Sequence, residues 1–155
     1  MNHPERPLLC VADLVPHRGT MSWLDRVVRV NAERAVAEAD IRGTSLFVRA
    51  GRLDAWIGIE YMAQTISVWA GHRARQEGRP IVLGFLVGTR RYDVHRQSFQ
   101  VGECLRMEAD CELMGSDGLG MFACRILVGD EVAAQANLSV FEPRAGAEFL
   151  NLNLP

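Results

Sequence analysis

The apolar segment 55–70 (AWIGIEYMAQTISVWA) limits the possible folds of this chain more than any other feature. It is too long for an ordinary strand and apolar on nearly every side, which predicts a helix packed inside a domain. Asp54 is a suitable N-cap for it, and Gly78 followed by Pro80 predicts that the helix ends near Gln76. Such a helix needs a sheet curved around it, or a second subunit, to cover its faces.

Shorter apolar segments on both sides of this helix predict antiparallel strands. The expected elements are a β-hairpin within 24–41 with its turn at 31–34, a polar irregular stretch at 42–54, and strands at 81–87, 104–114, 121–128 and 132–141. We expect a loose lead-in at 1–13 and an unstructured tail at 143–155 within a single domain of residues 1–155. The order predicts the α+β class, with an antiparallel β-sheet wrapped around one long central helix.

Composition narrows the possible functions. A net charge of -2 argues against nucleic acid as a partner, because phosphate binding needs excess positive charge. All 17 basic residues are arginines, so any phosphate or carboxylate would be bound by guanidinium forks. The apolar helix carries Glu60 and Gln64, which argues against a membrane span. Residues 1–6 have no apolar signal segment, so we expect a cytoplasmic protein.

The cysteines predict neither a disulfide framework nor a metal site. Their spacing matches no C-x-x-C or zinc pattern, so we expect four reduced, mostly buried thiols and no metal ion. These residues are Cys10, Cys104, Cys111 and Cys124.

Glu60 is the unusual residue of the apolar helix. Burying a lone carboxylate is costly, so it needs either a partner or a proton, and a protonated carboxyl is a general acid. His17, held behind Pro16, supplies a candidate base, and Gln64 follows Glu60 by one helical turn. The alternatives are a structural Glu60–Arg18 pair, a loop histidine held by a hydrogen bond, and a Gln64 bonded elsewhere.

Three segments resemble the hotdog-fold 3-hydroxyacyl-[acyl-carrier-protein] dehydratases. Residues 14–25 (LVPHRGTMSWLD) are similar to the family's L-P-H-R-x-P-[FM]-x-[LM]-[LV]-D, residues 58–64 (GIEYMAQ) to its I-I-E-A-M-A-Q, and residues 101–105 (VGECL) to its V-x-P-G-D-x-L. Residues 60–65 and 84–92 look closest to the ApeP-type dehydratases of aryl polyene clusters.

The resemblance implies a function and a site. His17 would be the base and Glu60 the acid in dehydrating a 3-hydroxyacyl thioester to a trans-2-enoyl thioester, in fatty acid or aryl polyene synthesis. In the family these two groups come from different subunits. Gln64 would bind Glu60, and the backbone N–H of Ala55 or Trp56 would bind the thioester carbonyl. The acyl chain would lie against residues such as Phe85 and Leu86, with Trp23 and Trp56.

The resemblance also implies partners. The substrate would arrive on the phosphopantetheine of an acyl carrier protein, with no further cofactor. Arg90, Arg91 and Arg96 form one basic cluster that suits an acidic carrier, and Arg49 and Arg52 form another. A homodimer is implied, with a higher oligomer or a mixed dimer with a paralogous dehydratase as alternatives.

The chain departs from the housekeeping enzymes just before the helix. They carry F-P-G-x-P-x-x-P-G there, whereas residues 46–55 of this chain read LFVRAGRLDA. Two other functions therefore stay open. A hotdog thioesterase would use Glu60 to activate water and would not need His17, and a non-catalytic subunit would partner a related dehydratase.

Overall fold

The computed structural model describes residues 9–143, and all exposures below refer to the single chain. Its helical elements are α1 (Val11–Leu14), the 3₁₀ turn η1 (Gly19–Met21), the 3₁₀ turn η2 (Ala55–Ile57) and α2 (Gly58–Gln76). Its strands are β1 (Arg26–Val30), β2 (Arg34–Asp40), β3 (Arg52–Asp54), β4 (Phe85–Val94), β5 (Ser98–Gln100), β6 (Cys104–Met114), β7 (Leu119–Val128) and β8 (Glu131–Phe141).

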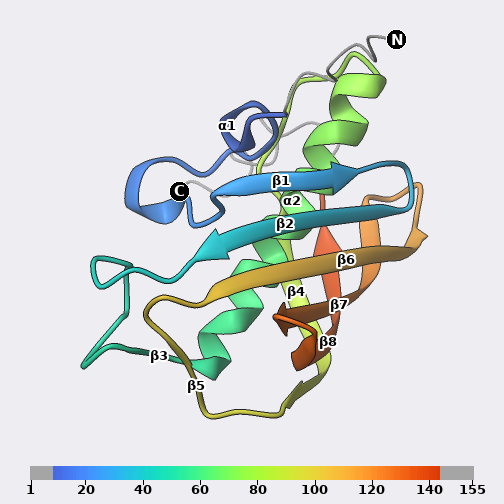
Figure 1. The fold of residues 1–155 in the computed structure, drawn as a ribbon. Coiled ribbons are helices and arrows are strands. Elements are labelled where there is room, and N and C mark those ends of the chain that lie inside the picture. The colour runs from blue at the N-terminus through green and yellow to red at the C-terminus, as the bar shows by residue number, and fades with distance from the viewer. Residues whose placement is uncertain (1–8, 144–155) are drawn as a thin grey trace, which may run out of the picture.

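One six-stranded antiparallel sheet runs in the order β1-β2-β6-β7-β8-β4 and curves around α2 (Figure 1). A second, two-stranded sheet of β3 and β5 lies beside the N-terminal end of the helix (Figure 1). The expected antiparallel sheet wrapped around one central helix is therefore confirmed. Among the described strands, β4 is an edge, with β8 on its only paired side.

The helix fills the concave side of the sheet. Met62, Ile66 and Trp69 are buried in one cluster with side chains of β2, β6, β7 and β8. The Trp69 ring meets the edge of Phe122 at a centroid distance of 5.1 Å, and its Nε1–H donates to the carbonyl of Ala32. The apolar part of this indole therefore packs against β7, and its N–H is hydrogen-bonded to the turn between β1 and β2.

Gly71 allows α1 to pack directly against α2. A Cβ built at Gly71 would lie 1.9 Å from the carbonyl oxygen of Leu14, so no side chain fits there. This close approach fixes the chain just before His17.

Several expectations about local structure are wrong. The strand expected at 81–87 begins at Phe85 and continues to Val94, because residues 91–94 also pair with β8. Strands β3 and β5 were not expected, since three residues are too few to show a pattern. Asp54 makes no capping bond, because η2 intervenes before α2. The lead-in is helical over 11–14, while residues 1–8 and 144–155 lie outside the described part.

The four cysteines are free thiols, but they are not mostly buried. Cys10 is exposed, Cys104 and Cys111 are half-buried, and only Cys124 is buried. Its burial raises the pKa of the Cys124 thiol well above the ordinary range.

Candidate active site

His17 and Glu60 meet within one chain. Nε2 of His17 lies 3.9 Å from Oε1 of Glu60, with 19% and 38% of the two side chains exposed. The expectation that the two groups come from different subunits therefore does not fit this geometry. Glu60 is also less buried than its apolar neighbours suggested, because its carboxylate faces a pocket rather than the sheet.

Arg18 shapes the loop that carries His17. Its guanidinium donates hydrogen bonds to the backbone carbonyls of Val15, His17 and Ala12, the last at 3.0 Å. The guanidinium donors of Arg18 are therefore bonded to backbone carbonyls that close the loop. The structure shows no ion pair between Arg18 and Glu60 within residues 9–143.

Gln64 joins the helix to this loop. It is fully buried, and its Nε2 donates to Oε1 of Glu60 at 3.0 Å and to the carbonyl of Met21 at 2.9 Å. Its Oε1 accepts the backbone N–H of Trp23 at 2.9 Å. One amide therefore holds the carboxylate of Glu60 and the segment that follows His17 in a fixed relation.

The two nitrogens of His17 have different surroundings. Nδ1 is buried and has no hydrogen-bond partner among the described residues. Nε2 is the nitrogen that faces Glu60. Any proton exchanged with a bound molecule therefore passes through Nε2, beside a carboxyl group that can supply or accept a second proton.

An apolar pocket begins at these two residues. Its walls include Ala63, Ile66 and Trp69 of α2, Phe85 and Leu86 of β4, and Phe122 of β7. Phe85 and Leu86, expected to contact an acyl chain, therefore line the same pocket as His17 and Glu60. Both come from the edge strand and are 39% and 44% exposed in the single chain.

The expected thioester donor at the helix start is only partly compatible with the structure. The N–H of Ala55 already donates to the carbonyl of Gln97 at 3.0 Å, and the hydroxyl of Tyr92 donates to the carbonyl of Ala55. Both the backbone N–H and the backbone carbonyl of Ala55 are therefore already hydrogen-bonded. Trp56 is 65% exposed and lines a different hollow, beside Arg49 and Arg52.

The expected carrier-binding arginines differ in their partners. Arg96 donates to both oxygens of Glu103, at 2.6 and 2.9 Å, and lies over the Phe99 ring. Arg91 forms an ion pair with Asp93 at 2.6 Å. Arg90 is exposed on β4. Two of the three positive charges are thus neutralised within the chain.

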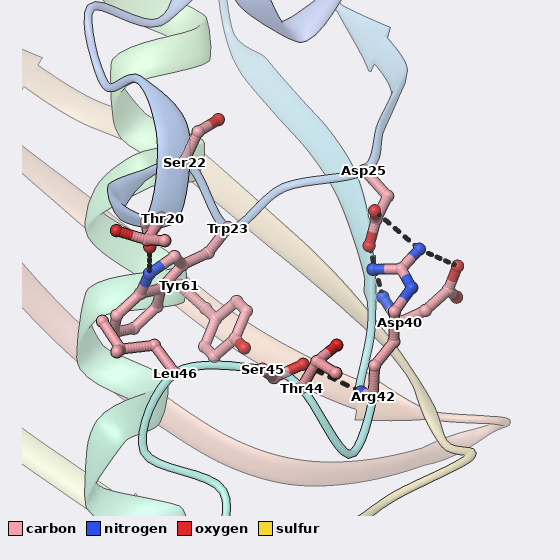
Figure 2. A pocket seen from close by; sticks show the side chains of 10 residues that line it. All are labelled: Thr20, Ser22, Trp23, Asp25, Asp40, Arg42, Thr44, Ser45, Leu46 and Tyr61. Atoms are coloured by element: carbon pink, nitrogen blue, oxygen red, sulfur yellow. Dashed lines mark hydrogen bonds and ion pairs between the residues drawn. The ribbon is translucent and has the colours of Figure 1, made fainter.

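A second hollow is lined by residues of the segments 20–25 and 40–46 and by Tyr61 (Figure 2). Its charged groups pair with each other, since Arg42 contacts Asp25 at 2.9 Å and Asp40 at 3.5 Å. The Tyr61 ring packs against Trp23, and burial, with the Asp25 charge, raises the pKa of Tyr61 to about 12. No sequence pattern predicts this hollow, because its residues come from three separate segments.

The described part of the chain contains no cluster of three or more His, Cys, Asp or Glu side chains suited to a metal ion. None of its helices combines the length and hydropathy needed to cross a membrane.

Comparisons with known proteins agree with this architecture. The ApeP-like family, described as ApeP dehydratase, matches residues 9–151. The dehydratase heterocomplex ApeI:P from Xenorhabdus doucetiae is similar with a TM-score of 0.85 and 25% identity, over 94% of this chain and 99% of that chain. No curated protein matches the sequence.

More distant structures share the fold alone. A sigma28-regulated virulence protein from Campylobacter jejuni has a TM-score of 0.63 at 12% identity, over 86% of this chain and 95% of that one. A hypothetical thioesterase with coenzyme A from Streptococcus pneumoniae has a TM-score of 0.56 at 14% identity, over 75% and 83%. Because the family match covers all of the described residues, the chain belongs to the ApeP-like family of dehydratases.

Proposed function

We propose that this protein dehydrates 3-hydroxyacyl thioesters carried on an acyl carrier protein, giving trans-2-enoyl thioesters for fatty acid or aryl polyene synthesis. The observation that carries the proposal is the placement of His17 Nε2 beside the Glu60 carboxyl, 3.9 Å away, at one end of an apolar pocket. Family membership supports the reaction type.

The proposed reaction balances with these two groups. Nε2 of His17 takes the C2 proton, and the electrons of the broken C–H bond form the C2=C3 double bond. The C3–O bond breaks, and Glu60 in its protonated form gives its proton to the leaving hydroxyl, which departs as water. His17 then returns its proton to Glu60, which the short separation allows.

The apolar pocket suits the acyl chain. A thioester at His17 and Glu60 would extend its chain along α2 past Ala63 and Ile66, toward Trp69 and Phe122. Aliphatic and conjugated chains are both accommodated by such walls, because burial of apolar surface drives their binding.

A dimer would complete this pocket. Phe85 and Leu86 of the edge strand line it, and Val87 beside them is 60% exposed. A partner strand paired with β4 would cover these side chains and exclude water from the site. The similar Xenorhabdus protein is part of a heterocomplex, so we propose a mixed dimer with a paralogous dehydratase as the working assembly.

The proximity of His17 to Glu60 favours dehydration over thioester hydrolysis. A thioesterase would need only Glu60 to activate water, so a histidine placed within 3.9 Å of that carboxyl would have no assigned role.

The test is intact mass spectrometry of a 3-hydroxyacyl carrier protein incubated with the purified protein, alone and with its paralogue. Wild type should remove the mass of one water, whereas His17→Ala and Glu60→Gln should not. His95→Ala, at an exposed histidine, is the matched control and should act like wild type. Release of free acid would make the protein a thioesterase. Carrier binding without a mass change would make it a non-catalytic subunit.

A further inference from the structure

A tight hairpin places two arginines opposite each other. The N–H of Arg49 donates to the carbonyl of Arg52 at 2.8 Å, and the N–H of Arg52 donates back at 3.0 Å. The two residues between them have positive φ, 50° at Ala50 and 73° at Gly51, as a type I′ turn requires. Directly opposed residues of an antiparallel pair project their side chains to the same face.

The two arginines have no ion-pair partner in the described part of the chain. Like charges opposite each other repel. The hollow that they line contains one acid, Asp54, so its net charge is positive. Arg91 and Arg96, by contrast, are already paired with Asp93 and Glu103.

The same hollow has an apolar side at the start of the helix that carries Glu60. Trp56 lines it with 65% of its surface exposed, and it precedes Glu60 by about one helical turn, roughly 6 Å along the axis. Phe47 also lines the hollow, is 52% exposed and has an unfavourable φ of 69°. Trp56 therefore stands between Glu60, about one turn further along the helix, and the two arginines that line the same hollow as Trp56.

We propose that Arg49 and Arg52 bind a phosphate group of the substrate's thiol carrier, while its pantetheine arm lies along Trp56. Two forked guanidiniums on one face match a phosphate better than separate point charges do. This assignment rests on the proposed function, because the carrier of the thioester substrate is what supplies the phosphate. Phosphopantetheine on a carrier protein and coenzyme A both carry such a phosphate.

The test compares two inert ligands that differ only in the phosphate. A 3-hydroxyalkyl thioether of phosphopantetheine and the same thioether of pantetheine are titrated into the full-length protein, and binding is followed by calorimetry. Wild type should bind the phosphorylated ligand about tenfold more tightly, as expected for charge-assisted hydrogen bonds. An R49Q/R52Q variant should lose this preference, whereas R106Q, which removes an exposed arginine of β6, should keep it.

The affinity for the pantetheine ligand should be the same in all three proteins, which shows that the fold and the acyl pocket are intact. Equal binding of the two ligands by wild type would overturn the assignment, as would a preference that survives in R49Q/R52Q. The assignment would also be overturned if R49Q/R52Q bound holo-carrier protein more weakly than wild type but bound both small ligands equally well. In that case the two arginines would contact carboxylates of the carrier protein.

Two further arms identify the source of the phosphate. Tighter binding of the coenzyme A thioether than of the phosphopantetheine thioether would identify coenzyme A, and equal binding would identify a carrier protein. The assignment and the proposed reaction fail separately. If wild type prefers the phosphorylated ligand but removes no water from the carrier-bound substrate, only the proposed reaction is contradicted. If wild type removes water but binds both ligands equally, only the phosphate assignment is contradicted.

Discussion

Nε2 of Gln64 lies 3.0 Å from Oε1 of Glu60, four residues earlier on the same helix. Because the other bonds of the Gln64 amide go to backbone groups of Met21 and Trp23, the orientation of Glu60 depends on the loop that carries His17. The acid and the base are thereby positioned by one fully buried side chain.

Replacing Gln64 by an apolar side chain of similar volume should show what its hydrogen bonds contribute to stability and to catalysis. Gln64→Leu keeps the volume but leaves the N–H of Trp23 and the carbonyl of Met21 without partners, so the free energy of unfolding should fall by about 2–4 kcal/mol. The rate kcat should fall about tenfold or more with little change in KM, because Glu60 loses its orientation. Urea unfolding and steady-state kinetics measure these effects. Gln135→Leu, on an exposed strand face, should change neither.

The contact between α1 and α2 should tolerate no side chain. In Gly71→Ala the new methyl would collide with the carbonyl of Leu14, so we expect a loss of about 3 kcal/mol or more in the free energy of unfolding. Elimination activity should also fall, because α1 positions the loop of His17. Gly88→Ala has open space around the new methyl and should shift the free energy of unfolding by less than about 0.5 kcal/mol. Equal stability of the two variants would contradict this packing.

Gly120 should set the size of the acyl pocket. A Cβ there would lie 2.7 Å from Met114 Cε, 3.0 Å from Phe122 Cε2 and 3.3 Å from Val140 Cγ2, and all three residues line the pocket. Gly120→Ala should push them inward and lower kcat/KM for long acyl chains about tenfold relative to short ones. Competition between long and short acyl carrier proteins measures this ratio. Gly43→Ala, with nothing near the new methyl, should leave it unchanged.

Asp40 should make stability depend on acid pH. Its hydrogen bond with Arg26 lowers the pKa of Asp40 from its ordinary 3.8 to about 2. The folded state then holds the proton less tightly than the unfolded state, so the stabilisation is complete above about pH 4 and disappears as the pH falls toward 2. Water screens these two side chains, which are 37% and 47% exposed, so the effect should stay within about 1 kcal/mol.

Urea unfolding of wild type and Asp40→Asn between pH 2 and 6 measures this effect. The variant should be the less stable protein at pH 6, and the difference should vanish near pH 2. A difference that persists at pH 2 would show that another feature of Asp40 is responsible.

The central helix, the first hairpin and the strands β6 to β8 were predictable because each has a long apolar pattern of its own. The bounds of the edge strand β4 were not predictable, since a strand exposed on both faces lacks such a pattern. Thiol burial was also misjudged, because the exposure of Cys10 depends on neighbours distant in sequence.

Local sequence determined which groups are available for chemistry, namely His17 behind Pro16 and Glu60 with Gln64 one turn later, because helical periodicity and backbone restriction act over a few residues. Tertiary structure alone decided that His17 and Glu60 meet in the same chain and that the N–H of Ala55 already donates to the carbonyl of Gln97. It also decided that Arg49 and Arg52 form no ion pair with any residue of 9–143. Each of these outcomes depends on how α1, β3, β5 and α2 pack. Packing brings together residues that are far apart in the sequence, and their spacing along the chain does not predict the contact.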